Sequence, residues 1–403
     1  MSSISLTDID YLLTPKAIRD TTYRIYNMAL DGETHFSVDE SKVDACADYV
    51  LDVINKNYPT HNIPFHSRWG HFKVGEIDRE ALFDEKLVDL DPIDKARTKL
   101  DLVITSVLLD AGAGKIWKYK EGDNFFNRSE GLAVASYYMF LDGSFSSDKS
   151  LVADGKGLEE LSKSSLEKAF QVSDDNPLVG VEGRLNLLKS LGKTVESNKE
   201  IFPQGRPGSL IDYLITKHGT TFEVSDILNA VLLGLGPIWP GRIDAHGMNL
   251  GDVWHYGPFG DDITVDTVVC FHKLSQWLTY SLVTPMIDAG LTITGAEKLT
   301  GLCEYRNGGL FLDFGVISLR DTDHYNHSHR PGSDLIIEWR ALTLQLLDSV
   351  GELIQNKLNK SPSDFPLAKV LEGGTWWAGR KIAKEKREDG SSPLTLDSDG
   401  TVF

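Results

Sequence analysis

The spacing of the apolar residues limits this chain to a mainly helical fold. In the segment that Ser333-Asp334 opens, apolar side chains recur every three or four residues, which places them on one face of a helix. The apolar positions of this segment are Leu335, Trp339, Leu342, Leu346, Val350 and Leu353. Few segments show the strict alternation that is typical of a half-buried strand. We therefore predict a large, mainly α protein with a few short strands.

The same period predicts further helices along the chain. Thr14-Pro15 and Asp91-Pro92 each place a proline in the first turn of such a segment, where its missing N–H costs nothing. We expect these helices at about 15–30, 37–57, 92–109, 129–140, 158–170, 176–191, 209–219, 224–233, 268–283, 296–301 and 367–387.

Length and composition suit one large core. The chain has 403 residues, of which 41% are hydrophobic, and it shows no internal repeat. We expect a single helical domain over residues 1–385, followed by a polar tail over 386–403. Two packed lobes joined by the polar connector near 144–157 are the alternative.

The charge and the cysteines exclude several classes of protein. A net charge of −18 repels a phosphate backbone, so we expect no nucleic-acid partner. The three cysteines are far apart and in no zinc-binding spacing, which fits a reducing compartment.

The start lacks the pattern of a secretory signal, and no segment has the roughly 18 apolar residues that span a bilayer. We expect a cytoplasmic protein, with a nuclear location as the alternative, and the sequence leaves its oligomeric state open.

Residues 296–340 contain two carboxylates that stand out. Glu304 follows a short predicted helix and opens the next one, so its charge faces free backbone N–H groups and stays ionised. This suits a group that stabilises a developing cation, although acidic residues also cap helices without any further role. Glu338 lies beside the apolar stripe, where a buried carboxylate must be paired or functional. Arg340 lies too far round that helix to be its partner.

Three other segments concentrate aromatic and titratable side chains. The loop 61–72 is cationic and aromatic, and the predicted helix 268–283 places Lys273, Trp277 and Tyr280 on one face. Both features are also typical of ordinary packing. The histidines of the third segment lack the helical spacing of a zinc site, which favours a solvated loop over a metal centre. These histidines are His324, His327 and His329.

Six segments of the chain resemble the uracil-catabolism protein 4 family of fungi and bacteria. They are residues 109–114, 129–136, 176–180, 271–282, 299–309 and 337–343, and the likeness covers nearly the whole chain. The resemblance implies a role in reductant-free pyrimidine breakdown, in which uracil is converted to its ribonucleotide, the ring is opened and urea is released.

A more distant resemblance connects the chain to the queuosine salvage proteins. Lys298-Leu299-Thr300 followed by Glu304-Tyr305-Arg306 is similar to a Leu-Thr and Ala-Asp-Tyr-Arg pattern of those proteins. Residues 249–254 and Glu338-Trp339-Arg340 resemble two further motifs in the same order. The resemblance implies a helical fold like that of helix-hairpin-helix DNA glycosylases, nucleoside N-glycosidase activity, and Glu304 at the position of the catalytic aspartate. Glu is one methylene longer, and Asn307-Gly308-Gly309 replaces a proline-containing turn.

These resemblances and the chemistry of N-glycosides lead to a functional hypothesis. Cleavage of a ribosyl C1′–N bond passes through a cation-like state, which needs a nearby anion and a proton for the departing nitrogen. We assign Glu304 to stabilise the cation and to orient or deprotonate water, and Asp252 to contact the ribose hydroxyls or the leaving group. The residues expected to bind the substrate are Tyr305, Arg306, Glu338, Trp254, Trp117, Tyr280, His66 and Arg68. Among them, Arg306, Arg68 and His66 are the candidate contacts for an anion of the substrate.

The expected substrate is a small molecule, a ribosylurea carried as its 5′-phosphate, with urea and ribose phosphate as products. We expect no metal and no cofactor. Two alternatives remain at this point: a metal-dependent amidohydrolase built on His324, His327 and His329, and a non-catalytic protein that binds a pathway intermediate.

Overall fold

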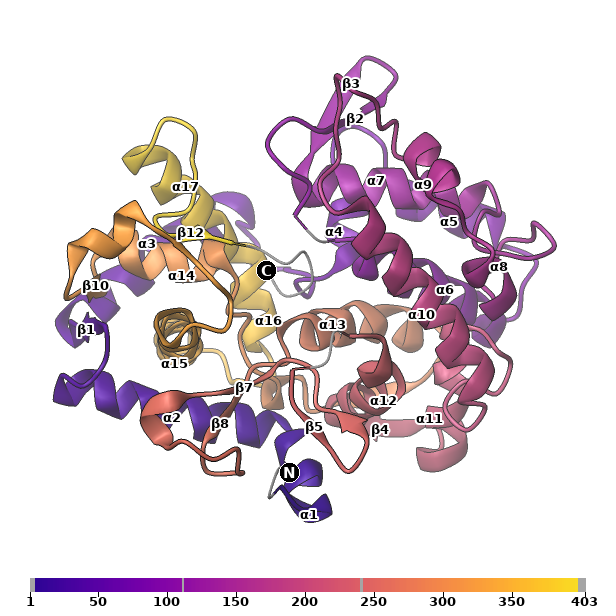
Figure 1. Ribbon diagram of the computed structural model, residues 1–403. Helices are drawn as coiled ribbons and strands as arrows, with labels where there is room; N and C mark the ends of the chain where they lie inside the picture. The colour runs from indigo at the N-terminus through magenta and orange to yellow at the C-terminus, as the bar shows by residue number, and fades with distance from the viewer. Residues whose placement is uncertain (1–3, 111, 240–241, 398–403) are drawn as a thin grey trace. The chain divides into compact units, whose positions relative to one another are not determined.

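The computed structural model describes residues 4–110, 112–239 and 242–397 (Figure 1), and it confirms a mainly helical protein with short strands. Within this part of the chain, the named strands form two-stranded pairs only. The residues divide into two compact units. The first unit comprises Met1–His66, Gly241–Gln276 and Gly295–Phe403, and the second comprises Ser67–Pro240 and Trp277–Thr294.

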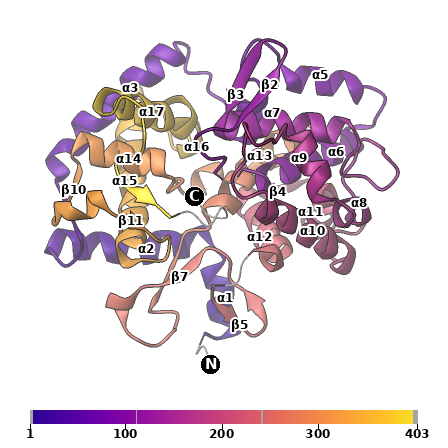
Figure 2. The same ribbon diagram turned by 45° about the horizontal axis from the view of Figure 1, so that its top comes forward.

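The first unit is organised around its longest helix, α15 (Asp334–Leu358). The helices α2 (Pro15–Asp31), α3 (Val43–Asn57) and α14 (Tyr305–Phe314) pack against α15, as Figures 1 and 2 show. Five of the six residues of the predicted apolar stripe are buried, and Leu353 is half-buried. The helix ends at Asn359, which adopts the left-handed conformation.

Short elements complete the first unit. Its other helices are α1 (Leu6–Leu12), α16 (Leu367–Val370) and α17 (Trp376–Lys386). Its strand pairs are β1 (Phe36–Val38) with β10 (Ile317–Leu319), β5 (Asp244–Ala245) with β6 (Met248–Asn249), β7 (Val253–His255) with β8 (Val268–Cys270), and β11 (Ser328–His329) with β12 (Thr395–Leu396).

A π-helical turn, Leu371–Thr375, interrupts the predicted helix 367–387 between α16 and α17. Its two glycines lie against neighbouring side chains. A Cβ at Gly373 would come within 2.6 Å of Ile63, and one at Gly374 within 2.6 Å of Val50. Close packing on α3 and on the following loop therefore explains why these positions are glycine.

The second unit is also mainly helical. Its helices are α4 (Arg68–Phe72), α5 (Arg79–Lys86), α6 (Pro92–Leu108), α7 (Arg128–Leu141), α8 (Gly155–Glu159), α9 (Lys163–Ala169), α10 (Val181–Ser197), α11 (Leu210–His218), α12 (Val224–Leu235) and most of α13 (Lys273–Asp288). Its strand pairs are β2 (Lys118–Glu121) with β3 (Asn124–Asn127), and β4 (Thr221–Glu223) with β9 (Thr292–Thr294). Residues 144–157 lie inside this unit, and the boundaries between the units fall elsewhere.

Several predicted element boundaries were wrong, each for a local reason. Residues 268–270 form β8, so α13 starts five residues later than expected. The side chain of Asn176 bonds the backbone of Lys118 at 2.9 Å through both its oxygen and its nitrogen, which holds the chain in a turn and delays α10. The helix expected at 296–301 is only a 3₁₀ turn, Ala296–Lys298.

The predicted polar tail packs into the first unit over its described part. Arg387 pairs with Asp313 at 2.7 Å, and Leu394 is buried. Residues 398–403 lie outside the described part of the chain. Among the described residues, no helix combines the length and apolar character that crossing a membrane requires.

A first prediction concerns the contact between α14 and α15. The Trp339 indole nitrogen donates to the Gly308 carbonyl oxygen at 3.1 Å, and a Cβ at Gly308 would lie 2.7 Å from the indole ring. Gly308→Ala should therefore lower the free energy of unfolding by about 1–3 kcal/mol, as overpacking does. Denaturant titration measures this change.

The matched control is Gly183→Ala on α10, where an added Cβ meets nothing within 4 Å. We expect the control to leave stability unchanged or to raise it by up to about 1 kcal/mol, because alanine favours helix. Equal losses in the two variants would contradict the packing argument.

Candidate active site

Glu304 occupies the N-cap position of α14, but its side chain makes no capping hydrogen bond. The backbone around it is held by other groups. The Thr300 N–H donates to the Gln276 side-chain oxygen at 2.9 Å, and the Asn307 amide donates to the Leu302 carbonyl oxygen at 2.9 Å. The Glu304 side chain is half-buried, and its Oε1 atom is enclosed. Glu304 therefore does not cap α14 through a side-chain hydrogen bond, and its role in catalysis stays a prediction.

His66 and Glu372 form a buried pair in the same unit. His66 Nδ1 lies 2.7 Å from Glu372 Oε2, and its backbone N–H donates to the Ala368 carbonyl oxygen at 3.1 Å. Tyr58 donates to the other oxygen of Glu372 at 3.3 Å. Burial lowers the pKa of His66, but the hydrogen bond to Glu372 and the charges of Glu372 and Glu304 outweigh it, so the pKa is raised. His66 is thus within electrostatic range of Glu304.

Asp252 forms a largely buried, bidentate ion pair with Arg340. The two guanidinium nitrogens lie 2.9 and 2.7 Å from the carboxylate oxygens. Asp252 also accepts from the Trp254 indole at 2.7 Å and from the Lys273 backbone N–H at 3.1 Å. Burial raises the pKa of Asp252, but the charge and hydrogen bonds of Arg340 outweigh it and hold the pKa well below its usual range. Asp252 therefore remains ionised and cannot serve as an acid near neutral pH.

The ion pair lies next to the Glu304 segment. Burial raises the pKa of the Cys303 thiol, and the charge of Arg340 acts against this shift. The charge of Lys273 acts on both Cys303 and His66. His272, directly before Lys273, has a φ of 47°, an uncommon conformation for a residue with a side chain. This turn joins β8 to α13, of which Lys273 is the first residue.

The sequence pattern did not identify Glu372, Lys273 or Arg340 as members of this cluster. Lys273 was noted only as part of a helix face. Glu372 lies 306 residues from its partner His66, and Arg340 lies 88 residues from Asp252. The spacing of residues along the chain does not indicate such distant pairs. They form only when the chain folds.

Three predicted substrate-binding residues belong to the second unit and are engaged there. Arg68 is fully buried and lies 2.6 Å from Asp110, so the prediction that it contacts a substrate anion lacks support. Trp117 is buried, and its indole donates to the Phe170 carbonyl oxygen at 2.8 Å, which is a core contact. Tyr280 is buried on α13.

Glu338 is buried and paired. This is one of the two alternatives, paired or functional, that the sequence left open for it. It accepts from the His35 backbone N–H at 2.7 Å, lies 2.9 Å from His35 Nδ1, and accepts from the Tyr256 hydroxyl at 2.8 Å. These contacts explain its burial without a substrate. Arg340 is not its partner, as predicted.

The remaining predicted residues, Tyr305, Arg306 and Trp254, lie in the first unit. Arg306 is buried, donates to the Gly390 carbonyl oxygen at 2.8 Å, and lies over the Tyr305 ring at 4.9 Å. Trp254 is half-buried, and Arg242 lies 4.6 Å from the centre of its ring. The hydrogen bond of Arg306 to Gly390 is a structural contact. Trp254 is hydrogen-bonded to Asp252 and so belongs to the ion-pair cluster.

The histidine-rich loop makes local contacts. His327 lies 3.1 Å from Asp323, and His329 Nε2 lies 2.8 Å from the His324 carbonyl oxygen. In the described part of the chain, no three His, Cys, Asp or Glu side chains are grouped so that they could hold a metal ion. The loop therefore offers no set of metal ligands for the alternative of a metal-dependent amidohydrolase.

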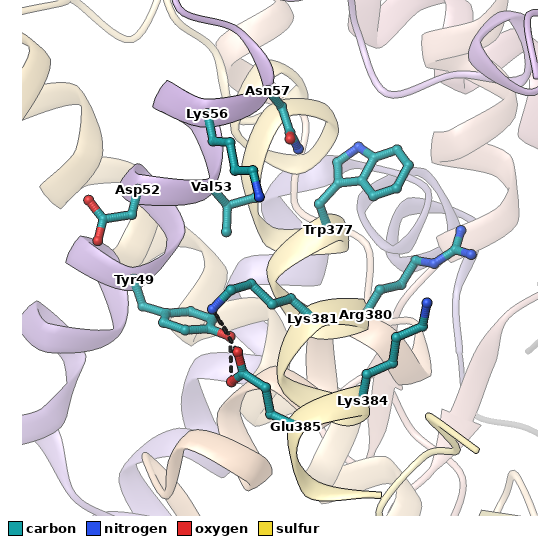
Figure 3. A pocket seen from close by; sticks show the side chains of 10 residues that line it. All are labelled: Tyr49, Asp52, Val53, Lys56, Asn57, Trp377, Arg380, Lys381, Lys384 and Glu385. Carbon is teal, nitrogen blue, oxygen red and sulfur yellow. Dashed lines mark hydrogen bonds and ion pairs between the residues drawn. The ribbon is translucent and has the colours of Figure 1, made fainter. Parts of the chain in front are cut away.

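A groove of about 680 Å³ lies between α3 and α17, as Figure 3 shows. It contains none of the predicted site residues. Its lining includes the cations of Lys56, Arg380, Lys381 and Lys384 and the rings of Tyr49 and Trp377. Lys381 donates to the Tyr49 hydroxyl at 2.9 Å, and Tyr49 donates to Glu385 at 3.0 Å. These hydrogen bonds pair the three polar groups with one another, so they do not indicate a catalytic site.

Comparison with known proteins places the whole chain in one family. A family model described as "Protein of unknown function (DUF1688)" matches residues 11–403. Uracil catabolism protein 4 of Lachancea kluyveri is 40% identical over 98% of this chain and 99% of its own length. Protein urg3 of Schizosaccharomyces pombe is 40% identical over 96% of this chain and 98% of its own. The chain therefore belongs to the DUF1688 family, the family of uracil catabolism protein 4.

Proposed function

We propose that this protein acts in uracil catabolism as an N-glycosidase that hydrolyses a ribosylurea 5′-phosphate to urea and ribose phosphate. The name of the Lachancea kluyveri relative supports the pathway, because 40% identity over nearly both full lengths relates the two chains closely. The observation that carries the reaction is the side chain of Glu304. It sits at a helix N-terminus, makes no capping bond and is half-buried in a cluster of charged groups.

This arrangement suits a cation-like transition state. Breaking the C1′–N bond leaves positive charge on the ribose ring, and a fixed carboxylate beside C1′ stabilises that charge. In this proposal Glu304 also accepts a proton from the water that attacks C1′. The partial positive charge of the α14 N-terminus favours the ionised carboxylate before the reaction.

Asp252 takes a different role from the one that its sequence position suggested. Its carboxylate accepts four hydrogen bonds, two of them from Arg340, and therefore has little capacity for ribose hydroxyls. We assign it to position Arg340 beside Cys303, and so to hold the backbone that presents Glu304. Lys273 then offers a cation for the 5′-phosphate.

The test uses the purified protein and the ring-opened product of uridine phosphate. We expect urea and ribose phosphate to appear together by mass spectrometry, at a rate that chelators do not change. Loss of activity on chelation would support a metal-dependent amidohydrolase instead. Binding of the compound without release of urea would show a non-catalytic binder.

A further inference from the structure

We propose that the groove between α3 and α17 binds a nucleoside monophosphate, with the base stacked on the indole of Trp377 and the phosphate held by the ammonium groups of Lys56 and Lys384. This inference does not depend on the proposed glycosidase function, because the groove contains none of the residues assigned to that reaction. The whole groove lies within the first unit.

Two facing stripes of side chains build the groove. Tyr49 and Lys56 lie two turns apart on α3, and Trp377, Lys381 and Lys384 recur at intervals of three and four residues on α17. At one end, Lys381 donates to the Tyr49 hydroxyl at 2.9 Å and so joins the two helices. The groove has a volume of about 680 Å³, within the roughly 300–1,000 Å³ that is typical of small-molecule sites.

The charge of the groove is opposite to that of the chain. The whole protein carries a net charge of −18, whereas four cations and two carboxylates line the groove. One of these carboxylates, Glu385, is already paired with Lys381 at 2.8 Å. Among the described residues, neither Lys56 nor Lys384 has a carboxylate within 4.0 Å. Both lysines are exposed, and their charges are therefore available to a bound anion.

The lysines alone do not identify a ligand. Each lies in the last turn of its helix, where a cation is favoured by the helix dipole without any bound anion. The carboxylates, however, leave one side of the groove cationic. Figure 3 shows Arg380 and Lys384 on the side of Trp377, and Asp52 on the opposite side, beside Tyr49. The cations thus gather around an aromatic ring.

That ring, the indole of Trp377, is the second observation. It is 40% exposed, although tryptophan is usually largely buried. Trp376 contacts it edge to face, with 4.8 Å between the ring centres, and the Arg380 guanidinium lies 5.5 Å from its centre. These contacts fix the orientation of a ring that still lines the groove.

A fixed ring beside free ammonium groups suits a ligand with two parts. A flat, aromatic part stacks on the indole, and a phosphate accepts hydrogen bonds from the lysines. A nucleoside monophosphate combines these parts. Because every base has a π-face, stacking on an aromatic side chain tolerates any base. The proposed site therefore recognises the class of ligand and does not require one particular base.

Isothermal titration calorimetry of the full chain tests this inference with four probes. They are uridine 5′-monophosphate, adenosine 5′-monophosphate, uridine and ribose 5-phosphate. We expect both monophosphates to bind, and uridine and ribose 5-phosphate to bind more weakly because each lacks one part. Added salt should weaken binding of the monophosphates, since it screens exposed charges. Failure of both monophosphates to bind would overturn the inference.

Two variants test the two parts of the site separately. Trp377→Leu should raise the Kd of the monophosphates about fivefold or more, as loss of base stacking does, and should leave the Kd of ribose 5-phosphate unchanged. Trp377→Phe, which keeps a ring, should retain most of the affinity. Lys384→Gln should raise the Kd of the monophosphates and of ribose 5-phosphate alike, by about three- to tenfold.

Two matched controls replace exposed residues of the first unit outside the groove. Lys360→Gln removes an exposed lysine, and Tyr23→Leu removes a ring that is 54% exposed. Both controls should leave every Kd unchanged. Trp377→Leu and Lys384→Gln variants that bound the monophosphates like the wild type would overturn the inference, as would an equal loss of ribose 5-phosphate binding in Trp377→Leu.

The same variants separate this inference from the glycosidase proposal. Lys384→Gln should release urea from ribosylurea 5′-phosphate as the wild type does, and Glu304→Gln should keep its affinity for the monophosphates. Binding that depended on Glu304 and not on Trp377 or Lys384 would place the ligand elsewhere and overturn the inference. A protein that bound monophosphates through the groove but released no urea would retain this site and lose the glycosidase function.

Discussion

Replacing Glu304 by glutamine is expected to lower the rate of urea release by about 10²–10³-fold, the loss typical of removing one group that stabilises transition-state charge. Glutamine has nearly the same shape but no negative charge to place beside C1′. The Glu304 side chain makes no capping bond, so α14 should form normally in the variant. Steady-state kinetics on ribosylurea 5′-phosphate, together with circular dichroism and thermal melting, measures both effects.

Glu352→Gln is the control for loss of one carboxylate. Glu352 is exposed on α15, and its replacement should leave turnover unchanged. A Glu304→Gln variant that turned over like the wild type would remove Glu304 from the mechanism. A variant that unfolded would instead assign Glu304 a structural role.

Arg340→Met should lower the free energy of unfolding by about 3–5 kcal/mol, the largest stability effect that we expect from one substitution. Arg340 is 1% exposed and the Asp252 side chain 11%, so removal of Arg340 leaves a largely buried carboxylate without its charged partner. Denaturant titration measures the loss. The double variant Asp252→Asn/Arg340→Met should recover part of it, because the unpaired charge is then gone. The control Lys381→Met removes an ion pair whose side chains are 49% and 50% exposed, and should cost less than about 1 kcal/mol.

The effect of Arg340→Met should depend on pH. Arg340 holds the pKa of Asp252 below its ordinary value, so the pair stabilises the fold fully above the unfolded pKa of about 4. This contribution is lost as pH falls through the lowered, folded pKa. The stability difference between wild type and Arg340→Met should therefore shrink in acid. A difference that stayed constant from neutral pH to about pH 2 would contradict the ion-pair account.

The helical framework was largely predictable because its signals are local. The apolar stripe of α15 and the proline at the start of α6 each depend on residues within a few turns of one another. The short elements were not predictable in the same way. Residues 268–270 fit a helical period but pair with 253–255 as strands, and the π-helical turn follows from packing of Gly373 and Gly374 on distant side chains. Such contacts override local propensity.

The candidate site was predictable only in part, for the same reason. Glu304 could be singled out because its position between two helical segments is a local feature. The partners of the other charged groups could not, since Asp252 meets Arg340 and His66 meets Glu372 only after the chain has folded. Burial in the structure also separates Glu338, which is fully paired by His35 and Tyr256, from Glu304, which has no capping bond.

The most direct measurement of the central claim uses ribosylurea 5′-phosphate labelled with ¹³C at the ureido carbon and ¹⁵N at both nitrogens. Cleavage of the C1′–N bond releases urea that keeps all three labels, together with unlabelled ribose phosphate, and we predict this result by mass spectrometry. Attack on the ureido carbon would instead release labelled ammonia and labelled carbon dioxide, and that result would contradict a glycosidase built on Glu304.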